Sequence, residues 1–240
     1  MPECIHGLEI PLCDICYPKT PPPKVAVVRA PRVSAPRLAG AVKTSRTSID
    51  PARQRVYHVT HIRNLEGILD TGAISADTPP VVDLSADLTR ELRLTAEVAP
   101  GSSVAQHVPF YLAPSAALWD DLRRGADDET RWSAAARSAA SADFVVLVTT
   151  VALLGEGAVI ADGDAAATFT RFATGDELGR ALTRLHDSEG LDAAEVLVPS
   201  AVPYDTIQLI GVANDRVRDR VRELTSTKVA VYPPWFIAEL

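Results

Sequence analysis

The chain has 240 residues, of which 47% are hydrophobic and 23% are charged, close to the average of globular domains. Such a chain can bury a substantial core, so wholesale disorder is excluded, and its apolar stretches are too short to cross a bilayer. No basic patch followed by an apolar run marks a signal peptide at its start. We therefore expect a cytoplasmic protein with no membrane partner.

The formal net charge of −7 combines two parts of opposite sign. Residues 1–56 contain nine Lys and Arg against four Asp and Glu, whereas the remainder is strongly acidic. All three cysteines lie within the first 16 residues. A basic arm on an acidic body keeps nucleic acid open as a partner, and the cysteine-free body has neither a disulfide framework nor a cysteine nucleophile.

Residues 1–18 carry two pairs of metal-ligating side chains. Cys4 and His6 form one pair, and after six intervening residues Cys13 and Cys16 form the other. Three thiolates and one imidazole match the tetrahedral ligand set of a structural zinc site, and in so short a segment the metal would supply the folding free energy. We interpret residues 1–18 as a zinc knuckle. The alternative is three free thiols and a solvent histidine, with a coincidental spacing.

Residues 19–53 are rich in proline, Lys and Arg, with no acidic residue before Asp50. This segment has many prolines and no apolar periodicity, and such a composition predicts an extended basic linker. The folded domain is expected to span residues 54–240.

Hydrophobic periodicity and β-branched runs predict the elements of this domain. In chain order they are a strand over 56–60, helices over 64–69 and 84–95, a strand over 108–112, helices over 115–124 and 127–142, strands over 144–150 and 159–160, a helix over 176–186, strands over 195–198 and 206–212, a helix over 215–224 and a strand over 229–231. Strands and helices are mixed without a βαβ rhythm, and there is no internal repeat. The expected fold class is therefore α+β.

Three separated segments carry a family resemblance. They are residues 57–72, which read YHVTHIRNLEGILDTG, residues 107–111, HVPFY, and residues 194–199, AEVLVP, followed near the end by VYPPWF over 231–236. In this order and spacing, across residues 55–237, the chain resembles the DarT family, bacterial toxins that ADP-ribosylate DNA bases. The resemblance implies an ADP-ribosyltransferase fold, with a split mixed β core flanked by helices and a cleft for NAD. NAD is then a consumed substrate, thymidine in single-stranded DNA is the acceptor, and a macrodomain antitoxin commonly reverses the modification in a toxin–antitoxin or phage-defence system.

Glu195 is the first candidate for a catalytic residue. Breaking the bond between nicotinamide and ribose develops positive charge on the sugar, which a nearby carboxylate stabilises. Glu195 begins an apolar strand that would hold it rigidly, and the resemblance supports it. The alternative is an ordinary charge at the start of a strand.

The NAD contacts implied by the resemblance lie on two other segments. His58 and Thr60 share one face of their strand and are assigned to the nicotinamide ribose and carboxamide, with Asn64 a further candidate. Tyr111 is a candidate to stack on nicotinamide, whereas Phe110 points toward the core. The alternative for the first pair is a satisfied core histidine beside a surface threonine.

A functional arginine is implied on the helix between the first two segments, where the chain offers Arg90 and Arg93. We favour Arg93 as a second catalytic residue, because it lies nearer to the 107–111 strand. Its guanidinium would steady the pyrophosphate or an anion forming on the target base. The alternative is a solvated helix charge that pairs with Asp87 or Glu97.

The chain departs from the family pattern near its acceptor side. Ala193 occupies the position, two before the catalytic acid, at which related transferases often carry a polar residue that selects the acceptor. RNA or protein therefore remains open as the acceptor. In the segment 174–192, Arg180, Arg184 and His186 are possible target contacts, but a solvated helix face is the default interpretation. A non-catalytic, zinc-tethered binding module is the alternative from another functional class.

Overall fold

The structure is a computed structural model, and it describes residues 50–237 of the chain. Within this range, no helix is both long enough and apolar enough to span a bilayer. The four predicted zinc ligands Cys4, His6, Cys13 and Cys16, and nearly all of the 19–53 linker, lie outside the described residues. The zinc knuckle and the linker therefore stay predictions from the sequence.

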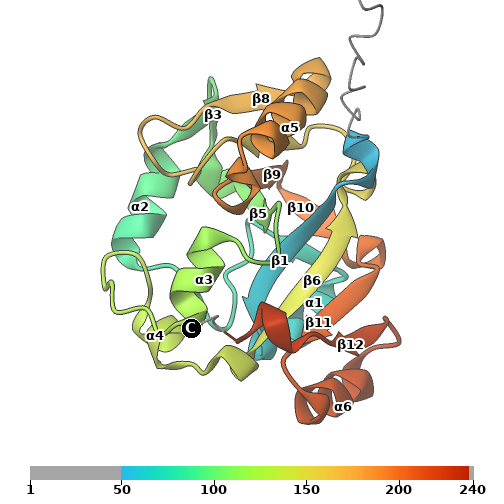
Figure 1. The fold of residues 1–240 in the computed structure, drawn as a ribbon. Helices are drawn as coiled ribbons and strands as arrows, with labels where there is room; N and C mark the ends of the chain where they lie inside the picture. Colours follow the sequence, from blue (N-terminus) through green and yellow to red (C-terminus); the bar gives the residue numbers. More distant parts are fainter. Residues whose placement is uncertain (1–49, 238–240) are drawn as a thin grey trace, which may run out of the picture. The chain divides into compact units, whose positions relative to one another are not determined.

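A mixed eight-stranded sheet forms the centre of the domain (Figure 1), in the order β12-β11-β6-β1-β5-β9-β7-β8. Its neighbouring strands pair antiparallel except for the parallel pair of β11 and β12. In chain order, the strands are β1 (Arg55–His61), β5 (His107–Tyr111), β6 (Phe144–Thr150), β7 (Val159–Ala161), β8 (Phe172–Thr174), β9 (Glu195–Pro199), β11 (Leu209–Val212) and β12 (Val229–Val231).

The sheet is split between β1 and β5. β1 pairs with β6 along its whole length, whereas β1 and β5 share only the register pair Tyr57 and Tyr111. On the far side, β5 pairs fully with β9, which places Tyr111 opposite Glu195. The rest of β1 therefore diverges from β5, and side chains between the two strands are left with open space.

Six helices and two small ribbons complete the described domain. The helices are α1 (Leu65–Thr71), α2 (Asp87–Thr95), α3 (Ala117–Arg123), α4 (Ala134–Ser138), α5 (Leu178–Asp187) and α6 (Asp215–Leu224). The ribbons pair β2 (Ala73–Ser75) with β10 (Ala201–Pro203), and β3 (Glu97–Ala99) with β4 (Ser102–Ser103).

Both faces of the sheet are covered by helices. Successive side chains of a strand point to opposite faces, so β6 contributes Val145 and Leu147 to one apolar cluster and Val146 and Val148 to the other. Residues of α1, α5 and α6 join the first cluster, and residues of α3 and α4 join the second. Burial on both sides explains why the sequence of β6 is continuously apolar.

The expected α+β class is confirmed, but the helix predicted over 127–142 is wrong. Only Ala134–Ser138 is α-helical, and Ser133 caps it by accepting a hydrogen bond from the Ala136 N–H. Trp132 is buried, its indole N–H donates to Asp121 at 2.6 Å, and its backbone forms a bridge with Ser85. These tertiary contacts override the helix propensity of the alanines.

Other differences concern short elements. Strands β2, β3, β4, β8 and β10 have two or three residues each, too few to produce an alternating pattern, and the sequence did not indicate them. The strand predicted over 206–212 begins only at Leu209, after a 3-10 turn over Tyr204–Thr206.

Candidate active site

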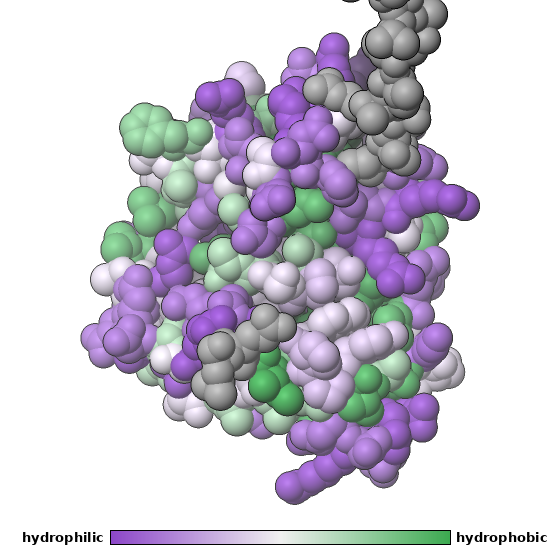
Figure 2. All heavy atoms as spheres, in the orientation of Figure 1, coloured by the Kyte–Doolittle hydropathy of each residue, from purple (hydrophilic) through white to green (hydrophobic). Residues whose placement is uncertain are grey.

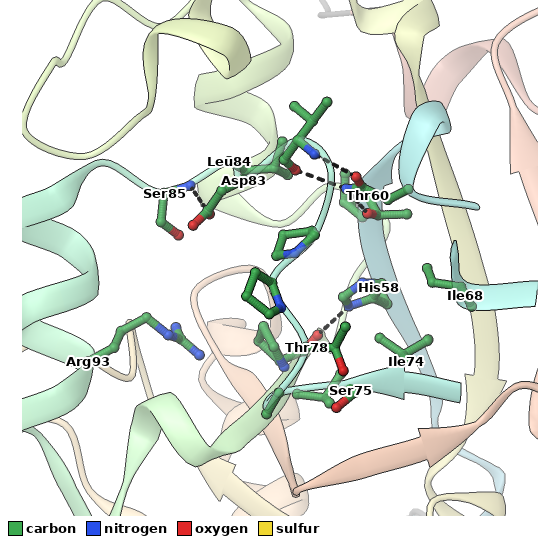
Figure 3. Close-up of a pocket in the computed structure, with 18 of the residues that line it drawn as sticks. His58, Thr60, Ile68, Ile74, Ser75, Thr78, Asp83, Leu84, Ser85 and Arg93 are labelled. Carbon is green, nitrogen blue, oxygen red and sulfur yellow. Dashed lines mark hydrogen bonds between the residues drawn. The ribbon is translucent and has the colours of Figure 1, made fainter. Parts of the chain in front are cut away.

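A cleft of about 360 Å³ opens where β1 and β5 diverge. All six site residues predicted in the folded domain line it. They are His58, Thr60, Asn64, Arg93, Tyr111 and Glu195. Figure 3 shows His58 and Thr60 on β1 at one side of the cleft, with Arg93 extending toward it from the opposite side. Their proximity is a structural finding, whereas their chemical roles stay predictions.

Glu195 is buried at the start of β9, with 2% of its surface exposed. One carboxylate oxygen, Oε1, accepts a hydrogen bond from the Ala165 N–H at 2.9 Å, and Oε2 lies 3.6 Å from Nη1 of Arg93. Burial raises the pKa of the carboxyl above its ordinary value, although Arg93 and the Ala165 amide act in the opposite direction. The carboxylate is therefore held in one orientation beside a cation.

Arg93 is the arginine that faces the cleft. Its side chain is 16% exposed, and its Nη2 atom is buried without a hydrogen-bond partner among residues 50–237. Arg90 instead lies outside the cleft lining, where it pairs with Asp83 at 3.0 Å and with Asp87. A buried guanidinium with unused donors is suited to an incoming anion or oxygen acceptor.

His58 has a defined tautomer. Its Nδ1 lies 2.9 Å from the carbonyl oxygen of Pro109 on β5, and since a carbonyl can only accept, Nδ1 carries the hydrogen. Burial lowers the pKa of His58, which favours the neutral ring. The neutral ring leaves Nε2 as a hydrogen-bond acceptor on the wall of the cleft.

The side-chain amide of Asn64 forms its hydrogen bonds with other groups of the protein. Its amide nitrogen donates to Oγ1 of Thr60 at 3.0 Å and to the Val82 carbonyl at 2.9 Å, and its Oδ1 accepts from the Val82 N–H at 2.7 Å. Both amide hydrogens are therefore used. Asn64 fixes the segment that follows β2 against β1, and the hydroxyl hydrogen of Thr60 remains able to donate.

Tyr111 forms part of the wall between His58 and Glu195. Burial, followed by the nearby Glu195 carboxylate, raises the pKa of its phenol, so the ring stays neutral. Its neighbour Phe110 is fully buried in the core, as predicted. The ring of Tyr111 thus offers an uncharged aromatic surface inside the cleft.

Three charged residues of the cleft lining, Asp83, Arg131 and Asp164, were not predicted from the sequence. Nη1 of Arg131 lies 2.7 Å from Oδ2 of Asp164, and both residues line the cleft. Arg131 lies within residues 127–142, where the sequence predicted a single helix and no functional residue. Asp164 precedes three alanines and carries no recognisable motif, so the sequence offered no signal for it.

The three residues named as possible target contacts lie outside the cleft. Arg180, Arg184 and His186 are on α5, and none of them lines the cleft. Arg180 is 3.7 Å from Glu177, in an exposed pair.

Comparison with known proteins identifies the family. The chain matches the family described as ssDNA thymidine ADP-ribosyltransferase, DarT, over residues 57–237. Proteins of Mycobacterium bovis and Mycobacterium tuberculosis, each described as a DNA ADP-ribosyl transferase, are 28% identical to it over 198 residues, which cover 70% of this chain and 80% of theirs.

Solved structures share the fold. Thermus sp. 2.9 DarT in complex with ADP-ribosylated ssDNA has a TM-score of 0.65 at 22% identity, over 78% of this chain and 98% of that one. The same protein in complex with NAD+ has a TM-score of 0.63 at 23% identity, over 80% and 100% of the chains. Thermosipho africanus DarTG in complex with ADP-ribose has a TM-score of 0.58 at 19% identity, over 76% of this chain but 51% of that one.

The split mixed sheet is thus the fold of an ADP-ribosyltransferase. Because the family match spans about three quarters of the sequence, the protein belongs to the DarT family of ssDNA thymidine ADP-ribosyltransferases.

Proposed function

We propose that this protein transfers ADP-ribose from NAD to thymidine in single-stranded DNA and acts as the toxin of a toxin–antitoxin or phage-defence system. In the reaction, the bond between the nicotinamide nitrogen and the ribose carbon breaks, and nicotinamide leaves. A bond forms between that carbon and N3 of thymine, the base's only ring nitrogen that carries a hydrogen, and the N3 proton is released. The pairing of Glu195 with Arg93 inside the cleft is the observation that carries this proposal.

Glu195 stabilises the positive charge that develops on the ribose. A carboxylate fixed by the Ala165 N–H needs no reorganisation when that charge appears, and its burial strengthens the interaction. Arg93 opposes protonation of Glu195 and keeps buried donors for an anion, either the pyrophosphate of NAD or the thymine whose N3 loses its proton.

The remaining predicted residues bind and orient NAD. Nε2 of His58 accepts, and the hydroxyl of Thr60 donates, hydrogen bonds to the nicotinamide ribose and carboxamide. The neutral ring of Tyr111 stacks on nicotinamide. Asn64 is a positioning residue, because its amide is committed to Val82 and Thr60 rather than to a ligand.

The acceptor is unpaired DNA, since pairing in a duplex hides N3 of thymine. The described domain belongs to the acidic part of the chain, and a negatively charged body repels phosphates. The basic 19–53 linker supplies sequence-independent affinity that offsets this repulsion. Because both NAD and DNA are substrates, the enzyme acts in the cytoplasm.

A macrodomain antitoxin removes the modification. The structure of Thermosipho africanus DarTG, in complex with ADP-ribose, is matched over 51% of its own chain. We assign reversal to a macrodomain, and co-expression of such a domain should cancel the growth defect that expression of this chain causes.

Mass spectrometry tests the activity. A single-stranded oligonucleotide with one thymidine is incubated with the full chain and NAD, and a mass increment of one ADP-ribosyl group is expected. Duplex DNA, the corresponding RNA and a cell lysate serve as parallel acceptors. Glu195→Gln preserves an acceptor for the Ala165 N–H and should reduce transfer by about 100-fold or more. The proposal would be overturned if wild type and this variant gave equal transfer, or if the ADP-ribosyl group were found only on RNA or protein.

Metal analysis tests the zinc knuckle separately. The purified full chain should contain stoichiometric zinc, and Cys13→Ser together with Cys16→Ser should abolish it. Zinc-free wild-type protein, purified without chelator, would refute the ligand assignment.

A further inference from the structure

The loop that joins β7 to β8, residues 162–171, exposes a phenylalanine. Phe169 is 93% exposed, the highest value for a large hydrophobic residue in the described part of the chain. A phenylalanine at this position contributes almost no burial to the fold. Packing therefore does not account for it.

Hydrogen bonds on both sides of Phe169 define the loop. The Ala167 N–H donates to the Asp164 carbonyl at 2.9 Å, and the Thr170 hydroxyl donates to the same carbonyl at 2.6 Å. The Thr170 N–H donates to the Ala167 carbonyl at 3.2 Å. The ring is thus presented to solvent on a closed turn.

The same loop contacts the candidate catalytic groups. The Ala165 N–H holds the Glu195 carboxylate at 2.9 Å, and Asp164 pairs with Arg131 on the cleft wall. The buried side chain of Ala165 joins an apolar cluster with Leu197 of β9, which anchors the base of the loop. Phe169 is therefore an exposed residue that follows, four positions later in the chain, the residue whose backbone amide fixes Glu195.

Helix α2 also exposes apolar side chains. Figure 2 shows hydrophobic residues over the edge where α2 and the β7–β8 loop lie in Figure 1. Leu88, Leu92 and Leu94 of α2 are exposed there at 46%, 46% and 63%. Arg171, two residues after Phe169, is also exposed, so the loop combines an aromatic ring with a cation.

We propose that Phe169 stacks on a base of the acceptor strand next to the target thymidine, so that it is a specificity-determining residue for single-stranded DNA. The inference rests on the proposed function. Every base has an aromatic face, which duplex stacking hides and a single strand exposes, and Arg171 is suited to the phosphate that accompanies such a base. An unchanged KM for DNA in Phe169→Ala would instead assign the exposed ring to a protein partner.

The experiment combines protein variants with modified oligonucleotides. Single-thymidine oligonucleotides carry an abasic site at one flanking position at a time. Phe169→Ala should lower kcat/KM for the intact oligonucleotide by about 5- to 150-fold, chiefly through KM, and Phe169→Trp should restore it. Leu153→Ala removes a side chain that is 41% exposed, on the 3-10 turn after β6, and should leave kcat/KM within about twofold.

A double-mutant cycle separates stacking from a structural effect. At one flanking position the abasic site should weaken wild type as much as Phe169→Ala does, and it should add almost nothing to that variant. Phe169→Ala should also keep the melting temperature and the thermal stabilisation by NAD of the wild type. Additive losses at every flanking position, or an unchanged KM for DNA, would overturn the inference while transfer by wild type still supports the proposed function. If wild type modifies no oligonucleotide, the proposed function fails and this inference fails with it.

Discussion

Replacing Asn64 by alanine tests whether this residue holds the cleft together. The substitution removes three hydrogen bonds, to the N–H and the carbonyl of Val82 and to the Thr60 hydroxyl. Asn64 is 5% exposed and Val82 is 7% exposed, so the Val82 backbone groups lose their partners away from water.

The expected cost follows from these contacts. An unsatisfied buried polar group costs about 1–3 kcal/mol, and the segment after β2 can recover part of this by moving toward solvent. We expect a loss of about 2–4 kcal/mol in the free energy of unfolding, which corresponds to a fall of about 5–15 °C in melting temperature for a domain of this size. The loosened segment lines the cleft, so KM for NAD should rise as well.

Denaturant unfolding and steady-state kinetics measure the two effects. Asn214→Ala is the matched control, because Asn214 caps α6 through one hydrogen bond to the Val217 N–H at 3.1 Å on the exposed surface. The control should cost about 1 kcal/mol and leave KM for NAD unchanged. If Asn64→Ala is no more destabilising than the control and KM stays the same, Asn64 does not position the cleft.

Three further predictions follow from the structure. Arg93→Ala should reduce transfer by about 100-fold or more, and Arg90→Ala should stay within about threefold; equal losses in a transfer assay would contradict the choice between them. The pKa of His58 is lower in the folded state than in the unfolded state, so the unfolded state takes up a proton first as pH falls. The contribution of the neutral ring to stability is therefore fully present above the unfolded pKa of about 6.5 and declines below it. His58→Gln should therefore flatten the dependence of melting temperature on pH between about 7 and 5, and an unaltered slope would refute this. Gly211→Ala would place a Cβ 2.5 Å from the ring of Trp235 and should destabilise the fold by about 1–3 kcal/mol. Calorimetry measures this loss, and an unchanged stability would mean that the ring can move without cost.

Much of the sheet and of the site could be predicted from local sequence. Alternating or continuous apolar residues mark β1, β6 and β9 because the period of a strand is short and its burial repeats within a few residues. Glu195 and His58 lie on such strands, within the segments that resemble DarT. For this reason their location on rigid elements followed without any tertiary information.

The choice between Arg90 and Arg93 required the tertiary structure. Both arginines lie on α2, and only long-range packing decides which one turns toward the cleft. Asp83 and Asp87 engage Arg90, whereas Arg93 lies against Glu195, which is far away in sequence.

Contacts between distant segments also decided the features that the sequence left open or predicted wrongly. The alanine-rich pattern over 127–142 predicted one helix, because helix propensity is local and cannot register the burial of Trp132. The ion pair of Arg131 and Asp164 joins two loops with no shared motif. By itself the sequence determined most of the longer elements, the family resemblance and the candidate residues on regular strands. Only the tertiary structure decided which loops and which arginine complete the cleft, because the cleft arises where β1 and β5 diverge, and strand register is a non-local property.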